Sequence, residues 1–206
     1  TLRMVDDGRT VFETRVVVGK ADDTRTPEFS GSVTYLVVNP TWHVPDSIAQ
    51  RVYLPKLKAN PNALANANMR IFTRSGTEID PRLVDFTLFS QGNFPFRIKQ
   101  NPSDENALGK VKFMFPNKFN IYLHDTPSRQ LFASTGRAFS HGCIRVHEAE
   151  VFAEKLMGLD RGMTKDEIDA IVAYGELKRI NLKQKVPVHL AYFTVWIGDD
   201  GVVQFF

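Results

Sequence analysis

The chain has 206 residues, of which 43% are hydrophobic and 24% charged, a composition typical of a globular protein with an apolar core. The formal net charge of +3 comes from scattered basic residues, which argues against a nucleic-acid partner. No segment approaches the ~18 consecutive apolar residues of a membrane span. A single cysteine excludes an internal disulfide and a multi-cysteine zinc site.

The first third of the chain is predicted to be β structure. Residues 2–5 and 10–18 are rich in β-branched side chains and flank a turn sequence at residues 6–8, which is the pattern of a hairpin. Residues 19–32 are polar and contain proline and glycine, so they predict a loop. A further strand is expected at residues 33–39.

The middle of the chain changes character and predicts an insertion at residues 45–106. Asp46 is a suitable N-cap for a helix, which Pro55 is expected to interrupt. Short strands are predicted at residues 69–73 and 86–89. A lid or substrate-facing subdomain is the functional interpretation of this insertion, and a passive insertion is the structural one.

The β pattern returns after the insertion. Residues 111–115 and 120–124 alternate between apolar and polar side chains, which places His124 at the end of a strand. Residues 125–137 contain proline and glycine and predict a loop. These two strands would carry the first candidate catalytic residue.

Two helices and a strand are predicted in the last third. Residues 149–157 have helical spacing, and Gly158 suits the C-terminus of that helix. A second helix is expected to begin at Thr164, which forms the sequence pattern of a capping box with a glutamate three residues later. Residues 186–197 predict a closing strand.

Both ends of the chain fall on predicted strands, at residues 2–5 and 202–206. We therefore expect an excised domain of a longer protein. Any contact with a membrane is expected only through segments outside this chain.

The residues that most clearly indicate catalytic chemistry lie in the segment Ser140-His141-Gly142-Cys143-Ile144-Arg145. A nearby cation or a helix N-terminus lowers a thiol pKa from about 8.5 and supplies thiolate, and we expect both effects at Cys143. Gly142 has no side chain, so a carbonyl group can approach the amides of Gly142 and Cys143, as an oxyanion hole requires. The segment therefore predicts a cysteine nucleophile.

Two histidines are candidates for the base. His141 lies two residues from Cys143, whereas His124 lies at the end of its predicted strand. If residues 120–124 pair beside the segment that carries Cys143, the imidazole meets the thiol at roughly 3–4 Å. Sequence alone leaves both histidines open. The other three histidines are expected to be structural: His43, His147 and His189.

Other interpretations of these residues have less support. A phosphatase loop needs an arginine six residues after the cysteine, whereas Arg145 follows Cys143 by two. A metal site formed by His124, His141 and Cys143 has uneven ligand spacing, and no metal or cofactor is expected. A buried inert cysteine is the usual role of a lone Cys, but it fits poorly with flanking His, Gly and Arg.

The histidine, the spacer and the sequence Ser140-His141-Gly142-Cys143-Ile144-Arg145 resemble the signature of L,D-transpeptidases with the YkuD-type catalytic domain. Further similarity covers nearly the whole chain and looks like the larger Gram-negative members typified by YcbB, which carry an insertion in the catalytic domain. The segments that carry this further similarity are 18–20, 26–27, 39–45, 108–109 and 122–127.

The resemblance implies a mainly β (α+β) catalytic domain over residues 1–206, β-sandwich-like with a few helices, and a partly helical subdomain inserted at residues 45–106. In the family, the residue matching Cys143 is the nucleophile, the residue matching His124 is the base, Asp125 orients the imidazole, and the amides at Gly142 and Cys143 bind the oxyanion. The residues expected to line the substrate site are Trp42, Tyr122, Ser140, His141 and Arg145.

The resemblance also implies the substrate. Cys143 would attack the third-residue carbonyl of a peptidoglycan tetrapeptide stem and release D-Ala, and an acceptor diaminopimelate amine would then form a cross-link between third-position residues. Expected partners are stem peptides and carbapenem β-lactams, and the expected location is the periplasm. An L,D-carboxypeptidase and a non-catalytic wall-binding module remain alternatives. A papain-like peptidase is disfavoured because the base precedes the cysteine.

Overall fold

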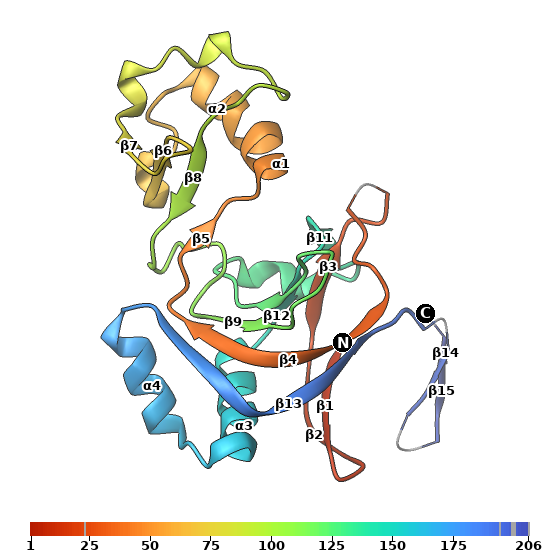
Figure 1. The fold of residues 1–206 in the computed structure, drawn as a ribbon. Helices are drawn as coiled ribbons and strands as arrows, with labels where there is room; N and C mark the ends of the chain where they lie inside the picture. Colours follow the sequence, from red (N-terminus) through yellow and green to blue (C-terminus); the bar gives the residue numbers. More distant parts are fainter. Residues whose placement is uncertain (23, 194, 199–200, 206) are drawn as a thin grey trace.

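The computed structural model describes residues 1–22, 24–193, 195–198 and 201–205. It is mostly β with a few helices, which confirms the predicted α+β class. Its main sheet has seven strands in the order β11-β3-β12-β10-β9-β4-β13 (Figure 1). These strands are β3 (Val16–Gly19), β4 (Phe29–Val38), β9 (Val111–Met114), β10 (Leu123–His124), β11 (Ala138–Ser140), β12 (Ile144–Val146) and β13 (Lys178–Leu190).

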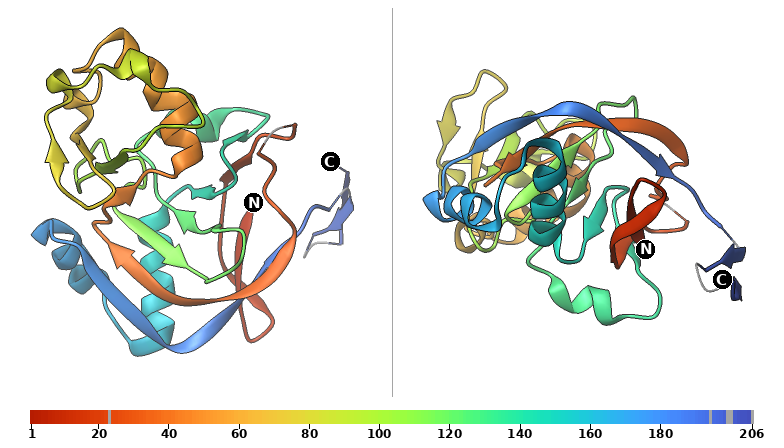
Figure 2. Two further views of the ribbon diagram at one scale, coloured as in Figure 1. Left: turned by 45° about the horizontal axis from the view of Figure 1, so that its top comes forward. Right: turned by 90° about the horizontal axis from the view of Figure 1, so that it is seen from below.

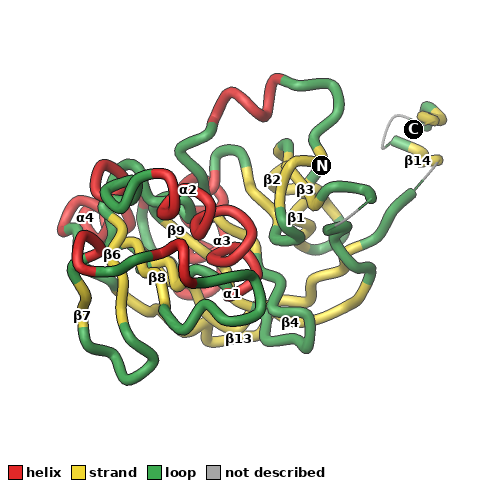
Figure 3. Tube along the Cα trace, turned by 90° about the horizontal axis from the view of Figure 1, so that it is seen from above, coloured by secondary structure: helices red, strands yellow, loops and turns green. Residues whose placement is uncertain are grey.

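Two antiparallel hairpins lie beside the main sheet. The predicted N-terminal hairpin is confirmed as β1 (Leu2–Asp6) and β2 (Arg9–Thr14), but its second strand ends at Thr14 and residues 16–18 belong to β3 of the main sheet. The second hairpin, β14 (Val195–Ile197) with β15 (Val203–Phe205), lies on the opposite side of the molecule from the helices of the insertion (Figure 3). Phe206, in the predicted C-terminal strand, lies outside the described residues.

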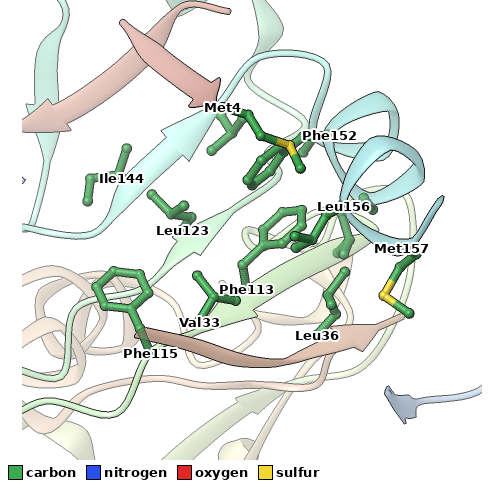
Figure 4. Close-up of a cluster of buried hydrophobic side chains, with 14 of the residues drawn as sticks. Met4, Val33, Leu36, Phe113, Phe115, Leu123, Ile144, Phe152, Leu156 and Met157 are labelled. Carbon is green, nitrogen blue, oxygen red and sulfur yellow. The ribbon is translucent and has the colours of Figure 1, made fainter. Parts of the chain in front are cut away.

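The larger hydrophobic core lies on one face of the main sheet, where α3 (Ala149–Arg161) and α4 (Lys165–Tyr174) are found (Figures 1 and 2). Leu123 pairs with Phe113 on one side and Ile144 on the other, so a row of three buried side chains points into this core (Figure 4). Side chains alternate along a strand, so the next row points to the opposite face.

A second, four-stranded sheet lies beyond that opposite face and has its own hydrophobic core. Its order is β5 (Trp42–His43), β8 (Arg97–Gln100), β6 (Met69–Phe72) and β7 (Glu78–Ile79). A helical run covers it, formed by α1 (Asp46–Ile48), η1 (Ala49–Tyr53) and α2 (Leu54–Ala59). These elements occupy most of the predicted insertion at residues 45–106, whose standing as a separate unit or a lid stays a prediction.

The helical run differs from the prediction at two residues. Asp46 is the first helical residue and Pro45 occupies the N-cap position. Pro55 does not interrupt the helix, because the preceding turn η1 is a π-helix in which the Leu54 amide bonds to the Ala49 carbonyl. A widened π-turn moves the carbonyl that a proline ring would otherwise contact, and proline has no N–H to leave unpaired.

Other boundaries also differ. Residues 86–89 are not a strand: η4 (Phe86–Leu88) is a 3₁₀ turn whose cap is the Asp85 carboxylate, which accepts from the Thr87 amide. The first C-terminal helix passes through Gly158 and ends at Gly162, whose φ of 70° suits glycine. The capping box at Thr164 is confirmed.

The predicted closing strand is shifted: β13 already begins at Lys178, because it pairs along the length of β4. That long strand also starts at Phe29, four residues before its predicted beginning. Among the described residues, no helix has the length and apolar character needed to cross a membrane.

The core makes a stability prediction. Phe113 is 0% exposed and its ring centroid lies 4.5 Å from that of Phe152. Phe113→Ala removes this packing and leaves a cavity, so we expect it to lower the free energy of unfolding by about 3–5 kcal/mol. Leu83→Ala, at a side chain that is 84% exposed, is the control and should change it by less than about 0.5 kcal/mol in denaturant titration. Equal effects would contradict the core assignment.

Candidate active site

Three neighbouring strands place the candidate base. The short strand β10 pairs in parallel with β12 and antiparallel with β9, so His124 is in register with Arg145 on one side and Lys112 on the other. This row adjoins the buried row of Leu123, so it points away from the larger core and toward the second sheet. The pairing that would bring residues 120–124 beside the cysteine segment is therefore present.

The imidazole of His124 is 5% exposed and held in one tautomer. Its Nδ1 lies 2.5 Å from the backbone carbonyl oxygen of Asp125. A carbonyl only accepts hydrogen bonds, so Nδ1 carries the proton and Nε2 keeps its lone pair. Burial lowers the pKa of His124 to about 3, and the charges of Arg145 and Lys112 add to that effect. The ring is thus neutral at physiological pH.

Asp125 orients His124 through its carbonyl, while its carboxylate holds the surrounding loops. Oδ2 accepts a hydrogen bond from the Lys110 amide at 2.9 Å. Oδ1 forms an ion pair with Arg129 Nη2 at 2.8 Å, but the two groups are not oriented for a hydrogen bond. A Cβ on Gly109 would lie 2.2 Å from Oδ2, and the φ of Gly109 is +58°. Burial raises the pKa of Asp125, opposed by the Lys110 hydrogen bond and the Arg129 charge.

Cys143 lies immediately before β12 and two residues before Arg145, which makes it a diagonal neighbour of His124 across the two strands. Its thiol is half-buried and donates to the Asn120 carbonyl at 3.7 Å. Tyr122 is a further hydrogen-bond partner of the thiol. The resting thiol is thus bonded to the segment that leads into β10 and has its proton turned toward Asn120.

The expected lowering of the Cys143 pKa is wrong in direction. Burial raises the pKa of the thiol, and this outweighs the opposing effects of Tyr122, Lys112 and Arg145. The expected helix N-terminus is also absent from this position, because β12 follows Cys143 directly and α3 begins only at Ala149. The resting thiol is therefore protonated beside a neutral imidazole.

A set of short polar side chains fixes the loop that carries Cys143. The Ser140 hydroxyl donates to the Cys143 carbonyl at 2.6 Å and accepts from the Gly142 amide at 3.1 Å. The buried Thr26 hydroxyl donates to the Gly142 carbonyl at 2.7 Å and accepts from the Gly19 amide at 2.9 Å. The loop is thus tied to itself and to the end of β3.

These bonds change the predicted oxyanion hole. The Gly142 amide is already bonded to Ser140, so it is not an open donor in this structure. Within the described chain the Cys143 amide has no such partner, which leaves it as the available donor. Gly142 is still required here, because its φ is +112° and a Cβ would lie 3.1 Å from Ile121 Cδ1.

Tyr122 connects the site to the second sheet. Its ring packs against both hydrophobic clusters, and its centroid lies 5.6 Å from that of His124. Its hydroxyl is hydrogen-bonded with Cys143 and with Trp42, and burial raises its pKa. Trp42 itself is 8% exposed and belongs to the core of the second cluster. Trp42 therefore reaches the site through the Tyr122 hydroxyl.

The predicted residues do not all converge. Tyr122 and Arg145 lie at Cys143, Ser140 supports its loop, and His141 is exposed on the surface. Residues that sequence reasoning missed are Lys112, Asn120 and Thr26. Lys112 was visible only as an outward residue in an alternating strand, and Thr26 only as part of the similarity at residues 26–27. In the described residues, no three His, Cys, Asp or Glu side chains group as a metal site.

Comparison with known proteins assigns the family. Residues 1–172 match the YkuD family model, described as the L,D-transpeptidase catalytic domain. This chain therefore belongs to that family, which confirms the resemblance to the YkuD-type catalytic domain, whereas the YcbB-like subgroup stays a prediction. A curated protein from Haemophilus influenzae, named "Putative L,D-transpeptidase", is 35% identical over 203 residues, covering 98% of this chain and 41% of that protein. The chain thus spans about two fifths of the length of that relative.

The raised thiol pKa predicts the pH dependence of alkylation. Because burial favours the protonated form, we expect the rate of Cys143 alkylation by iodoacetamide to keep rising above pH ~8.5, the ordinary thiol value. The denatured chain, which has the same single cysteine, is the control and should level off near that value. A plateau of fast alkylation at pH 5–7 would show a thiolate–imidazolium pair instead.

The Thr26 hydroxyl predicts a second effect. Thr26→Val keeps the shape of the side chain but leaves the Gly19 amide and the Gly142 carbonyl without their partner. We expect the free energy of unfolding to fall by about 1–3 kcal/mol, measured by denaturant titration. Thr26→Ser should restore most of it, and Thr10→Val, at an exposed residue of β2, should have little effect. Equal stability of the Thr26→Val and Thr26→Ser proteins would argue against the role of this hydroxyl.

Proposed function

We propose that this chain is the catalytic domain of a peptidoglycan L,D-transpeptidase, with Cys143 as nucleophile and His124 as general base. The observation that carries the proposal is the pairing of β10 with β12, which sets a buried imidazole of defined tautomer beside the cysteine loop. Membership of the L,D-transpeptidase family supplies the substrate class.

The first half-reaction acylates the enzyme. As Cys143 Sγ attacks the third-residue carbonyl carbon of a donor tetrapeptide stem, the thiol proton passes to Nε2 of His124. The carbonyl oxygen becomes an oxyanion, which the Cys143 amide stabilises. The C–N bond then breaks, the imidazolium returns the proton to the departing amine of D-Ala, and a thioester remains.

The low pKa of His124 suits this second proton transfer. A buried imidazolium that faces the charges of Arg145 and Lys112 is more acidic than an ordinary one, so it readily protonates the leaving amine. In the second half-reaction, the diaminopimelate amine of an acceptor stem attacks the thioester and gives its proton to His124. The C–S bond then breaks, the departing thiolate of Cys143 takes the proton back from His124, and the product is a cross-link between third-position residues.

The proposed subgroup, location and partners rest on the family resemblance and on the insertion at residues 45–106. The second sheet with its helices supports a place among the larger Gram-negative members typified by YcbB. We propose a periplasmic role in cell-wall synthesis and cell shape, with stem peptides as partners and acylation by carbapenems. An L,D-carboxypeptidase would use the same acylation step with water as acceptor. Comparing the products formed from tetrapeptide muropeptides separates these two activities.

Covalent labelling tests the nucleophile. After incubation with a carbapenem, intact-mass spectrometry should show one adduct on the wild-type chain, because a β-lactam carbonyl acylates the same thiol. Cys143→Ala should give none. A folded wild-type chain without an adduct would contradict the assignment of Cys143 and favour a non-catalytic wall-binding module.

The same measurement tests the base. His124→Ala removes the acceptor for the thiol proton, so we expect acylation to slow by about 10²-fold or more. His141→Ala is the matched control, since His141 is exposed on the surface, and it should leave the rate nearly unchanged. The reverse order of effects would move the base to His141.

A further inference from the structure

Among the described residues, two cations at the site lack an anionic partner. Lys112 and Arg145 flank His124 in register, and Arg145 Nε is buried without a hydrogen-bond acceptor. In the part of the chain that the structure describes, Lys112 forms no ion pair or hydrogen bond, and its Nζ lies 5.6 Å from the Tyr122 ring centroid. Many other basic side chains are paired, as in Arg3–Glu13, Arg70–Glu78, Arg82–Asp80, Lys110–Asp104 and Arg129–Asp125.

Two partly buried cations without an anionic partner destabilise the folded state. Burial lowers the pKa of both Lys112 and Arg145, because each positive charge has lost hydration that no carboxylate replaces. Asp125, the acidic residue that follows His124, already holds the Lys110 amide and Arg129. The thiol of Cys143 is protonated at rest and supplies no negative charge. A ligand with a negative charge would supply the missing partner.

We propose that Lys112 and Arg145 together bind a free carboxylate of the donor stem while its scissile carbonyl lies at Cys143. This inference rests on the proposed function. Neighbouring strands are about 4.8 Å apart, so the two residues lie about 10 Å apart on either side of His124, a span that their long side chains bridge. The Arg145 guanidinium and the Lys112 ammonium can thus bind one carboxylate from two sides.

A donor stem offers two carboxylates near the scissile bond. One belongs to the departing D-Ala, and the other to the side chain of diaminopimelate. Both have the same chemistry, and amidation of either one identifies it. The site would therefore select donors that carry this carboxylate, a role separate from the proton transfers of His124.

The experiment compares the rate of Cys143 acylation by three peptides: the tetrapeptide stem, its C-terminal amide, and its amide at the diaminopimelate side-chain carboxyl. We expect the wild-type chain to react at least about 30-fold more slowly with one amide, since removing one partner of a buried charge pair has an effect of that order. Lys112→Gln and Arg145→Gln should lose most of this preference, while Lys112→Arg should keep it. Lys118→Gln, at an exposed lysine of the β9–β10 connection, is the control.

The preference, rather than the rate, is the decisive readout. If the cations only tuned the thiol or the fold, each variant would slow all three peptides by one factor, and the proposal would be wrong. Equal wild-type rates with all three peptides would also overturn it, with the proposed function intact. No acyl adduct from any peptide would contradict the proposed function itself. Thermal unfolding of each variant shows whether a lost rate reflects a lost fold.

Discussion

The parallel pairing of β10 with β12 is the constraint on which the rest of this structure depends. It sets Leu123 opposite Ile144 and His124 opposite Arg145, and the Ile144 amide extends it by bonding to the Tyr122 carbonyl at 3.1 Å. The alternation of side chains then divides the chemistry between two faces. A shift of one residue would turn the imidazole into the larger core and move Leu123 out of it, so the buried row fixes the register that places His124 beside Arg145.

Burial controls the electrostatics of the site. It raises the pKa of Cys143 and lowers that of His124, so the resting pair is neutral even though two cations lie beside it. In the proposed mechanism the pair becomes charged only as the thiol proton moves to Nε2. In the proposed reaction, the unpaired Lys112 and Arg145 would keep a positive field at the place where an incoming carboxylate and a developing oxyanion are both negative.

Local patterns in the sequence predicted local structure well. The hairpin, the capping box at Thr164, the alternation around Lys112 and the position of His124 at a strand end all follow from nearest neighbours. In the segment that carries Cys143, what failed depended on distant partners. The three residues of β12 are too few to predict a strand from sequence, and they form one only because they pair with β10 and β3. The Cys143 pKa was mispredicted for the same reason, because its burial is set by segments far away in the chain.

The connection between the insertion and Cys143 rests on a few side chains. Trp42 lies in β5, where it pairs with Gln100, whose amide group in turn holds carbonyls at Ala67 and Glu105. From this anchored position Trp42 bonds to the Tyr122 hydroxyl, which also meets Cys143. A displacement of the second sheet would therefore alter the hydrogen bonding and burial of the thiol directly. The insertion is thus part of the thiol's environment, so its sequence can tune reactivity without contributing a group to the chemical step.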